Sequence, residues 1–421
     1  MPSTAAADCR PYLIALVLLL AGCGEAPWNN PHPPTPEGET VYQSVMSRPP
    51  KHLDPAISYA TDESLFLAQI YEPPLGYHFL KRPYELVPAG VRELPQVSYL
   101  DADGEVVPEG SEAVAFTRYT LDVREDAHYQ PHPAFAKNAD GEPLYLFSDA
   151  AEASAYRSMH DFAETGSRPV LASDYAYGIK RLADPELGSP MLGMMSRYIV
   201  GMQAFSDTVS AVERSGWLDL DNFSFDGLRV VDDHRLQITI HGVYPQFEFW
   251  LAMQFFAPIP PEADRFYHNP GFAERNLTMD WWPVGSGPYM MVENNPNSEI
   301  VLLRNPNYRA DFYPREGAPG DAEKGLLDDA GKRLPFIDRA VFTVEKEVLP
   351  LWTKFLQGYY DRSGEVHANT TGFFDQAFVV GPDGLEMSGD IANREITMTP
   401  DVKPGVYYYG FNMRDPVVGG Y

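Results

Sequence analysis

Residues 228–240 read LRVVDDHRLQITI, and this stretch is the clearest strand pair in the chain. Leu236, Ile238 and Ile240 alternate with polar residues, which predicts a strand with one buried and one solvent-facing side. A short polar segment separates this strand from the apolar residues that open the stretch. We therefore expect an antiparallel hairpin over residues 228–240.

Shorter strand and helix patterns lie on both sides of this hairpin. Apolar and β-branched residues predict strands over residues 41–46 and 339–344. Thr61 or Asp62 can cap a helix that ends before Pro73. Strands interleaved with helices indicate a mixed α/β architecture, and no repeat that would indicate a solenoid or propeller is visible. We also expect loops over residues 136–168 and 310–333, and a last strand over residues 407–412.

The N-terminal residues have the layout of an exported precursor. Arg10 precedes an uninterrupted apolar run over residues 12–21, which is about half as long as a membrane-spanning helix. The sequence LAGC that follows and ends at Cys23 resembles the lipobox of bacterial lipoproteins. We therefore expect residues 1–22 to be a lipoprotein signal peptide and Cys23 to be the lipidated residue. The alternative is an ordinary secretory signal with a chance cysteine.

Cysteine and proline usage agree with an exported, tethered protein. The chain has only two cysteines, Cys9 and Cys23, so we expect neither a disulfide framework nor a cysteine metal site. Five of the ten residues from 27 to 36 are proline, which predicts a semi-extended tether over residues 23–40. We expect a periplasmic, membrane-anchored lipoprotein, held on the outer face of the cell membrane or the inner face of the outer membrane.

The composition of the chain is that of an acidic globular protein. Hydrophobic residues make up 44% and aromatic residues 13% of the sequence, which excludes a disordered chain. The formal net charge of −27 leaves no basic face to neutralise phosphates, so nucleic acid is not an expected partner. The length of 421 residues exceeds the size at which one core normally keeps growing, so two or more domains are expected.

Several short stretches, taken together and in this order, resemble the family 5 solute-binding proteins, which are the peptide- and nickel-binding components of ABC importers. No single stretch is specific, but their collinear order over most of the chain is. They are KHLDP (51–55), IYE (70–72), residues 121–126, residues 173–185, residues 230–240, VGSGPY (284–289), RNPNY (304–308), LQGYYD (356–361) and FN (411–412).

The resemblance implies an α/β fold with the two-lobe architecture of type II periplasmic binding proteins. Residues 41–71 and 259–409 would form the main lobe, and residues 72–258 a subdomain inserted in it. Residues 410–421 would begin a closing lobe that is largely missing from this chain. We therefore expect the sequence to be part of a longer precursor, the alternative being a natural single-lobe variant.

The resemblance also points to candidate ligand-binding residues. Tyr59, Ala60 and Thr61 match the segment whose backbone pairs with an extended ligand, which is a form of strand addition. Tyr407 and Tyr408 would lie where the chain crosses between the lobes. Adjacent residues on a strand point to opposite faces, so at least one of these two tyrosines can instead be a packing residue.

The function implied is that of an extracytoplasmic solute-binding component of an ABC importer. It would capture a peptide-like or other small solute by hinge closure and deliver it to the permease transmembrane subunits, as a monomer without cofactor or metal. One alternative is an exported lipid-anchored hydrolase, although the chain has no Gly-x-Ser-x-Gly and no His-Glu-x-x-His motif and so offers no catalytic residues. The other is a binding protein repurposed as a sensor or chaperone.

Overall fold

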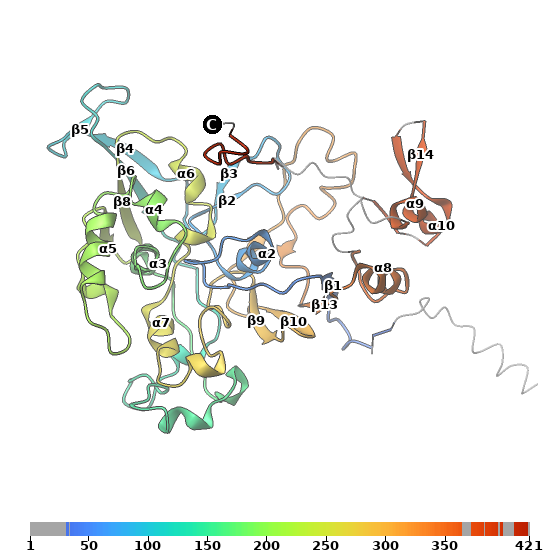
Figure 1. The fold of residues 1–421 in the computed structure, drawn as a ribbon, viewed down its shortest axis with the longest axis horizontal. Coiled ribbons are helices and arrows are strands. Elements are labelled where there is room, and N and C mark those ends of the chain that lie inside the picture. Colours follow the sequence, from blue (N-terminus) through green and yellow to red (C-terminus); the bar gives the residue numbers. More distant parts are fainter. Residues whose placement is uncertain are drawn as a thin grey trace, which may run out of the picture. The chain divides into compact units, whose positions relative to one another are not determined.

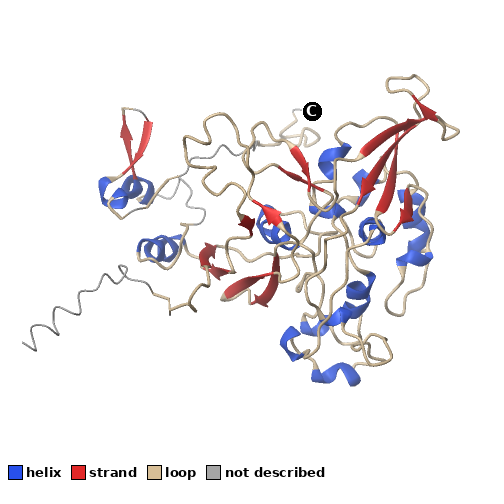
Figure 2. Ribbon diagram, turned by 180° about the vertical axis from the view of Figure 1, so that it is seen from behind, coloured by secondary structure: helices blue, strands red, loops and turns tan. Residues whose placement is uncertain are grey.

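The computed structural model describes residues 31–32, 34–363, 372–382, 384–394, 396–398 and 408–419. The chain divides into two compact units, and the boundary in the sequence lies between Gly364 and Glu365. The first unit contains two main sheets, and in both views these are separate from one another (Figures 1 and 2).

A four-stranded sheet combines segments that lie far apart in the sequence. Its order is β1 (Val41–Met46), β13 (Arg339–Val344), β10 (Glu299–Arg304) and β9 (Tyr289–Asn294). Strands β1 and β13 are parallel, whereas the other two pairs are antiparallel. Helix α2 (Thr61–Ile70) contributes to its core, because the rings of Phe66 and Phe342 lie 4.9 Å apart. The strands predicted over residues 41–46 and 339–344 are confirmed.

A five-stranded antiparallel sheet forms the core of the inserted region. Its order is β5 (Val106–Val107), β4 (Gln96–Leu100), β6 (Phe116–Asp122), β8 (Arg235–His241) and β7 (Leu228–Asp232). The hairpin predicted from residues 228–240 is confirmed as β7 and β8. Leu236, Ile238 and Ile240 are fully buried, as their alternation predicts, and helix α3 (Ala172–Leu182) packs beside these strands.

The remaining elements are short. The first unit also contains the helices α4 (Leu192–Met195), α5 (Met202–Ser210), α6 (Phe247–Trp250), α7 (Pro261–Tyr267) and α8 (Val348–Leu356), the 3-10 turns η1 (Pro133–Phe135), η2 (Glu152–Ala155), η3 (Met159–Asp161), η4 (Leu220–Asn222), η5 (Gln254–Phe256) and η6 (Ala273–Arg275), and the strand pairs β2 (Leu75–Tyr77) with β3 (Leu86–Pro88) and β11 (Asp311–Phe312) with β12 (Arg333–Leu334). The second unit contains α9 (Phe373–Ala377), β14 (Phe378–Gly381), β15 (Gly384–Met387) and α10 (Gly389–Ala392).

Residues 136–168, which we expected to be loops, are irregular apart from 3-10 turns but carry part of the core. Tyr145 and Phe162 are buried, and their rings lie 5.0 Å apart. Phe162 also contacts Phe266 of α7, at a centroid distance of 5.2 Å. Buried aromatic rings can therefore anchor a segment that lacks helical or strand periodicity.

Two expectations about local structure are wrong. Neither Thr61 nor Asp62 caps α2: the cap position is Ala60, and Thr61 is already the first helical residue. The described residues 408–412 form no strand, because no other described segment pairs with their backbone groups. Across the part of the chain that the structure describes, none of the helices has the length and apolar character needed to cross a bilayer.

Candidate functional site

The segment that links β1 to α2 contains the expected ligand-binding residues and is shaped by its own aspartate, Asp54. The carboxylate of Asp54 accepts the backbone N–H of Ala56, at 3.0 Å. Its carbonyl oxygen accepts the N–H groups of Ile57 and Ser58, at 3.1 and 3.0 Å. These bonds form a compact turn, so the segment enters α2 at a defined angle.

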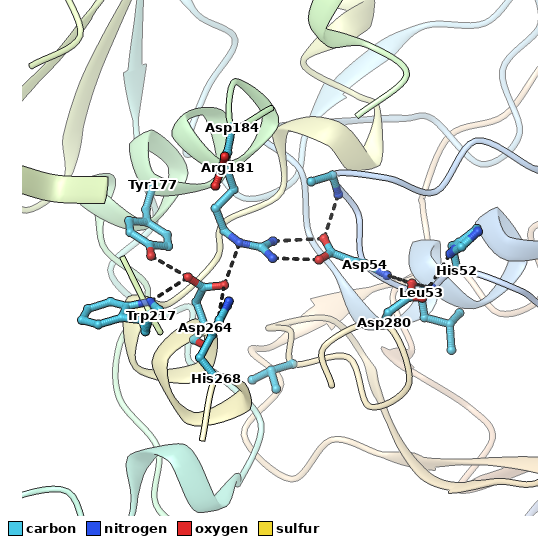
Figure 3. Close-up of polar contacts among 12 residues, drawn as sticks. His52, Leu53, Asp54, Tyr177, Arg181, Asp184, Trp217, Asp264, His268 and Asp280 are labelled. Carbon is cyan, nitrogen blue, oxygen red and sulfur yellow. Dashed lines mark hydrogen bonds and ion pairs between the residues drawn. The ribbon is translucent and has the colours of Figure 1, made fainter. Parts of the chain in front are cut away.

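Asp280 clamps the start of this segment from outside. Its carboxylate accepts the N–H groups of Leu53 at 2.9 Å and Asp54 at 3.2 Å, and lies 3.0 Å from Nδ1 of His52 (Figure 3). Because Asp280 belongs to a distant part of the chain, it ties the candidate segment to the region that precedes β9.

Glu63 holds the other end of the segment. Its buried carboxylate accepts the Ser58 hydroxyl at 2.8 Å and the N–H groups of Tyr59 at 3.2 Å and Ala60 at 3.1 Å. Burial acts to raise the pKa of Glu63, but the hydrogen bonds from Ser58 and from the backbone outweigh it and hold this pKa below its ordinary value of 4.5. The N–H groups of Tyr59 and Ala60 are therefore already used within the protein.

Three features of this segment remain open to a ligand: a carbonyl, a ring and the first turn of α2. Within the described residues, the carbonyl oxygen of Tyr59 accepts no hydrogen bond, whereas that of Ala60 accepts the N–H of Ser64 at 3.0 Å. The Tyr59 side chain is 69% exposed, and its ring lies 6.3 Å from that of buried Phe255. Thr61 is exposed at the first turn of α2, where backbone N–H groups have no intrahelical partner.

A buried chain of charges connects this segment to the inserted region. Arg181 of α3 donates two hydrogen bonds to Asp54, at 3.0 and 2.7 Å, and one to Asp264 of α7, at 3.0 Å (Figure 3). Tyr177 and Trp217 donate to the second oxygen of Asp264, at 2.7 and 2.8 Å. Burial acts to raise the pKa of Asp264, and the positive charge of Arg181 outweighs it, so this pKa lies below its ordinary value.

Two of the stretches that carry the family resemblance meet where α2 ends and β9 begins. We call this region, residues 70–72 and 284–289, the crossing. The N–H of Gly287 donates to the carbonyl of Ile70, at 2.8 Å. A Cβ atom on Gly285 would lie 1.9 Å from the same carbonyl oxygen, so only glycine fits there. Arg309 donates to Glu72 at 2.7 Å, although burial still raises the pKa of Glu72 above its ordinary value. The crossing is therefore closely packed and charged.

The expected site residues fall into three groups: some lie in the first unit, one lies in the second, and two lie outside the described residues. Tyr59, Ala60 and Thr61 lie together at the exposed start of α2. Tyr408 lies in the second unit and is 84% exposed, while Tyr407 and Cys23 lie outside the described residues.

Sequence reasoning missed the four charged residues that hold this segment: Glu63, Arg181, Asp264 and Asp280. Glu63 has a readable signal, because an acidic residue three positions after a helix cap reaches back to the cap backbone. Arg181 lies within the stretch 173–185 that carries the resemblance, but nothing local marks it as the partner of Asp54. Over the described residues, no group of three histidine, cysteine or acidic side chains could hold a metal ion.

Comparison with known proteins identifies the fold. The model of the family "Bacterial extracellular solute-binding proteins, family 5 Middle" matches residues 164–419. This chain belongs to that family. The family 5 protein therefore has the expected α/β periplasmic-binding-protein fold, and the resemblance based on short stretches is confirmed.

Curated relatives of the family 5 protein include periplasmic oligopeptide-binding proteins. The OppA proteins of Salmonella typhimurium and Escherichia coli are 26% and 24% identical to it over 231 and 232 residues. Each alignment covers 53% of this chain and 38% of the relative, so the chain matches well under half of the relatives' length.

Solved structures of similar proteins align over a longer part of the chain. The Escherichia coli murein tripeptide binding protein MppA is 18% identical, with a TM-score of 0.47 over 77% of this chain and 45% of that one. The pheromone receptor PrgZ is 15% identical, with a TM-score of 0.48 over 77% of this chain and 46% of that one.

Proposed function

We propose that this family 5 protein is the extracytoplasmic solute-binding component of an ABC importer. It captures a peptide-like or other small solute and delivers it to the permease transmembrane subunits. The observation that carries the proposal is the match of the solute-binding family model to residues 164–419. The oligopeptide-binding relatives favour a peptide-like solute. The protein binds without making or breaking a covalent bond in the solute, and it is no enzyme.

The proposed mechanism is hinge closure around the solute. Residues 41–71 and 259–409 act as the main lobe, residues 72–258 as its inserted subdomain, and residues 410–421 as the start of a closing lobe. Contacts that form only in the closed state shift the equilibrium toward it, and the permease recognises that state. The buried ion pairs of Arg181 with Asp54 and Asp264 support this role, because hinge closure needs one lobe that stays rigid while the other moves.

At Tyr59 and Ala60 the main lobe offers an acceptor to the solute rather than donors. Because Glu63 uses the N–H groups of Tyr59 and Ala60, the free carbonyl of Tyr59 is the group that pairs with an N–H of an extended solute. The exposed Tyr59 ring then covers the apolar side of that solute, and Thr61 bounds it at the start of α2. We also propose that Tyr407 and Tyr408 contact the solute, as the family resemblance implies.

The protein works in the periplasm as a monomer held by a lipid anchor at Cys23. Residues 1–22 are removed as a signal peptide, and residues 23–40 space the folded part from the bilayer. Two or more acyl chains give stable anchoring without help from charge. This fits a chain whose net charge of −27 gives no attraction to anionic headgroups.

Native mass spectrometry of the full-length protein, purified from its host without denaturation, tests the proposal. We expect a bound species of peptide-like mass that is released unchanged on unfolding, and that is depleted in the Tyr59→Ala variant. Tyr84→Ala, which removes another exposed tyrosine ring elsewhere on the first unit (48% exposed, against 69% for Tyr59), serves as the control and should retain the solute. The proposal fails if no solute copurifies, or if the protein hydrolyses the species that it binds.

A further inference from the structure

The first unit contains a hollow that the Tyr59 segment does not line. It is a partly open cavity of about 200 Å³ between η1, the irregular segment that follows it, and α7. Neither Tyr59, Ala60 nor Thr61 lines it. Its walls are mainly apolar and aromatic, and are formed by Pro133, Pro143, Tyr145, Trp217, Pro261 and Phe266.

The walls of this cavity are stiff and offer few polar groups. The three prolines have no backbone N–H to donate. The Trp217 indole is oriented by its hydrogen bond to Asp264, at 2.8 Å, and the Tyr145 hydroxyl accepts the N–H of Glu164, at 3.0 Å. The cavity is thus preformed, and an apolar group can enter it without displacing internal hydrogen bonds.

Two arginines and two carboxylates lie at or beside the cavity, and Arg168 pairs with both carboxylates, those of Asp174 and Glu262. Glu262 also lines the cavity, but both of its carboxylate oxygens accept hydrogen bonds from Arg168, each at 2.7 Å. Arg265 is exposed and holds its guanidinium 5.4 Å from the Trp217 ring centroid. Among the described residues it forms no ion pair. The formal charges of these four groups sum to zero, but the Arg265 guanidinium is the one that no described carboxylate contacts, and it lies beside an apolar hollow.

We propose that this cavity binds a small aromatic or branched aliphatic monocarboxylate. The apolar part of the ligand occupies the hollow, and its carboxylate accepts hydrogen bonds from Arg265, whose planar guanidinium suits a carboxylate. A protein cavity of about 150 Å³ can hold benzene, so this one has room for a ring with a short substituent. The inference goes beyond the proposed importer function, because the site is separate from the Tyr59 segment.

Isothermal titration calorimetry of the full chain with phenylacetate and phenylacetamide tests this site. We expect the carboxylate to bind about fivefold more tightly than the neutral amide, a modest ratio because Arg265 is exposed. Arg265→Gln should lower the affinity for phenylacetate to that for phenylacetamide. Arg229→Gln, which removes an exposed arginine that lines a different pocket of the first unit, should leave both affinities unchanged.

A second variant addresses the hollow itself. Ala134 also lines the cavity, so Ala134→Leu should remove the binding of both probes while circular dichroism shows an unchanged fold. Tyr59→Ala should retain phenylacetate binding even where it loses the importer's solute, which separates this proposal from the proposed function. The proposal is overturned if phenylacetate does not bind at millimolar concentration. It is also overturned if both probes bind with equal affinity, because the cavity would then accept any apolar group, such as a side chain of a partner protein. Equal losses of phenylacetate affinity in Arg229→Gln and Arg265→Gln would overturn it as well.

Discussion

At the scale of single residues, Glu63 determines the shape of the candidate segment. One carboxylate accepts hydrogen bonds from the Ser58 hydroxyl and from the N–H groups of His52, Tyr59 and Ala60. An amide in its place has one oxygen instead of two, so Glu63→Gln leaves a buried donor without an acceptor. We expect a loss of about 1–3 kcal/mol in the free energy of unfolding, measured with urea. Glu85→Gln, on the surface, should cost less than about 1 kcal/mol.

The same residue predicts a pH dependence. The pKa of Glu63 is lower in the folded protein than its ordinary value of 4.5, so its charge stabilises the fold above that pH. This stability is lost as the pH falls through the folded-state pKa. The difference in unfolding free energy between the wild type and Glu63→Gln should therefore be constant near neutrality and shrink below about pH 4.5. A difference that grows on acidification would contradict this assignment.

Arg181 is the residue on which the link between the two sheets depends. It is buried between Asp54 and Asp264, and a buried charge that loses its counter-charge is destabilising by about 3–5 kcal/mol. Arg181→Gln, which leaves the buried carboxylates of Asp54 and Asp264 without their counter-charge, should lower the unfolding free energy by about that amount in urea titrations. Asp122→Asn breaks the exposed pair with Arg235 and is the control, with an expected effect below about 1 kcal/mol. Equal losses in the two variants would refute a special role for the buried pair.

At the scale of elements, the crossing near Ile70 shows why a glycine-rich stretch matters. Gly285→Ala places a methyl group against the Ile70 carbonyl and forces backbone to shift, which should lower stability by about 1–3 kcal/mol. Gly216→Ala is a matched control, because a Cβ there meets nothing within 4 Å. Its effect should stay within about 0.5 kcal/mol. Differential scanning calorimetry of both variants decides the question, and equal melting temperatures would show that the crossing is not tightly packed.

The elements also show how far sequence alone can predict this molecule. The β7–β8 hairpin and the strands over residues 41–46 and 339–344 were predictable because their alternation is local. The bond between Asp280 and Leu53 was not, since the two residues are 227 apart and neither carries a local signal for the other. The strand expected over residues 407–412 was wrong for residues 408–412 because aromatic composition cannot supply a partner strand.

At the scale of the whole molecule, the strongest prediction concerns the anchor. The full-length protein should fractionate with membranes in its host, and Cys23→Ala should move it to the soluble periplasmic fraction, because the variant cannot be acylated. A wash with concentrated salt should not release the wild type, since electrostatic attachment is not expected for a chain of charge −27. Release by salt, or membrane retention of the variant, would contradict the lipid anchor.

The parallel pairing of β1 with β13 has a consequence for biosynthesis. Thr40, just before β1, bonds to Asp338, which is 298 positions further along the chain. During synthesis β1 therefore has no partner strand until the ribosome has added residue 344. The chain between the two strands is a long loop, and a loop of this length closes slowly. A polypeptide that cannot complete its sheet while it leaves the ribosome stays unfolded, which is the state in which a translocon accepts its substrate.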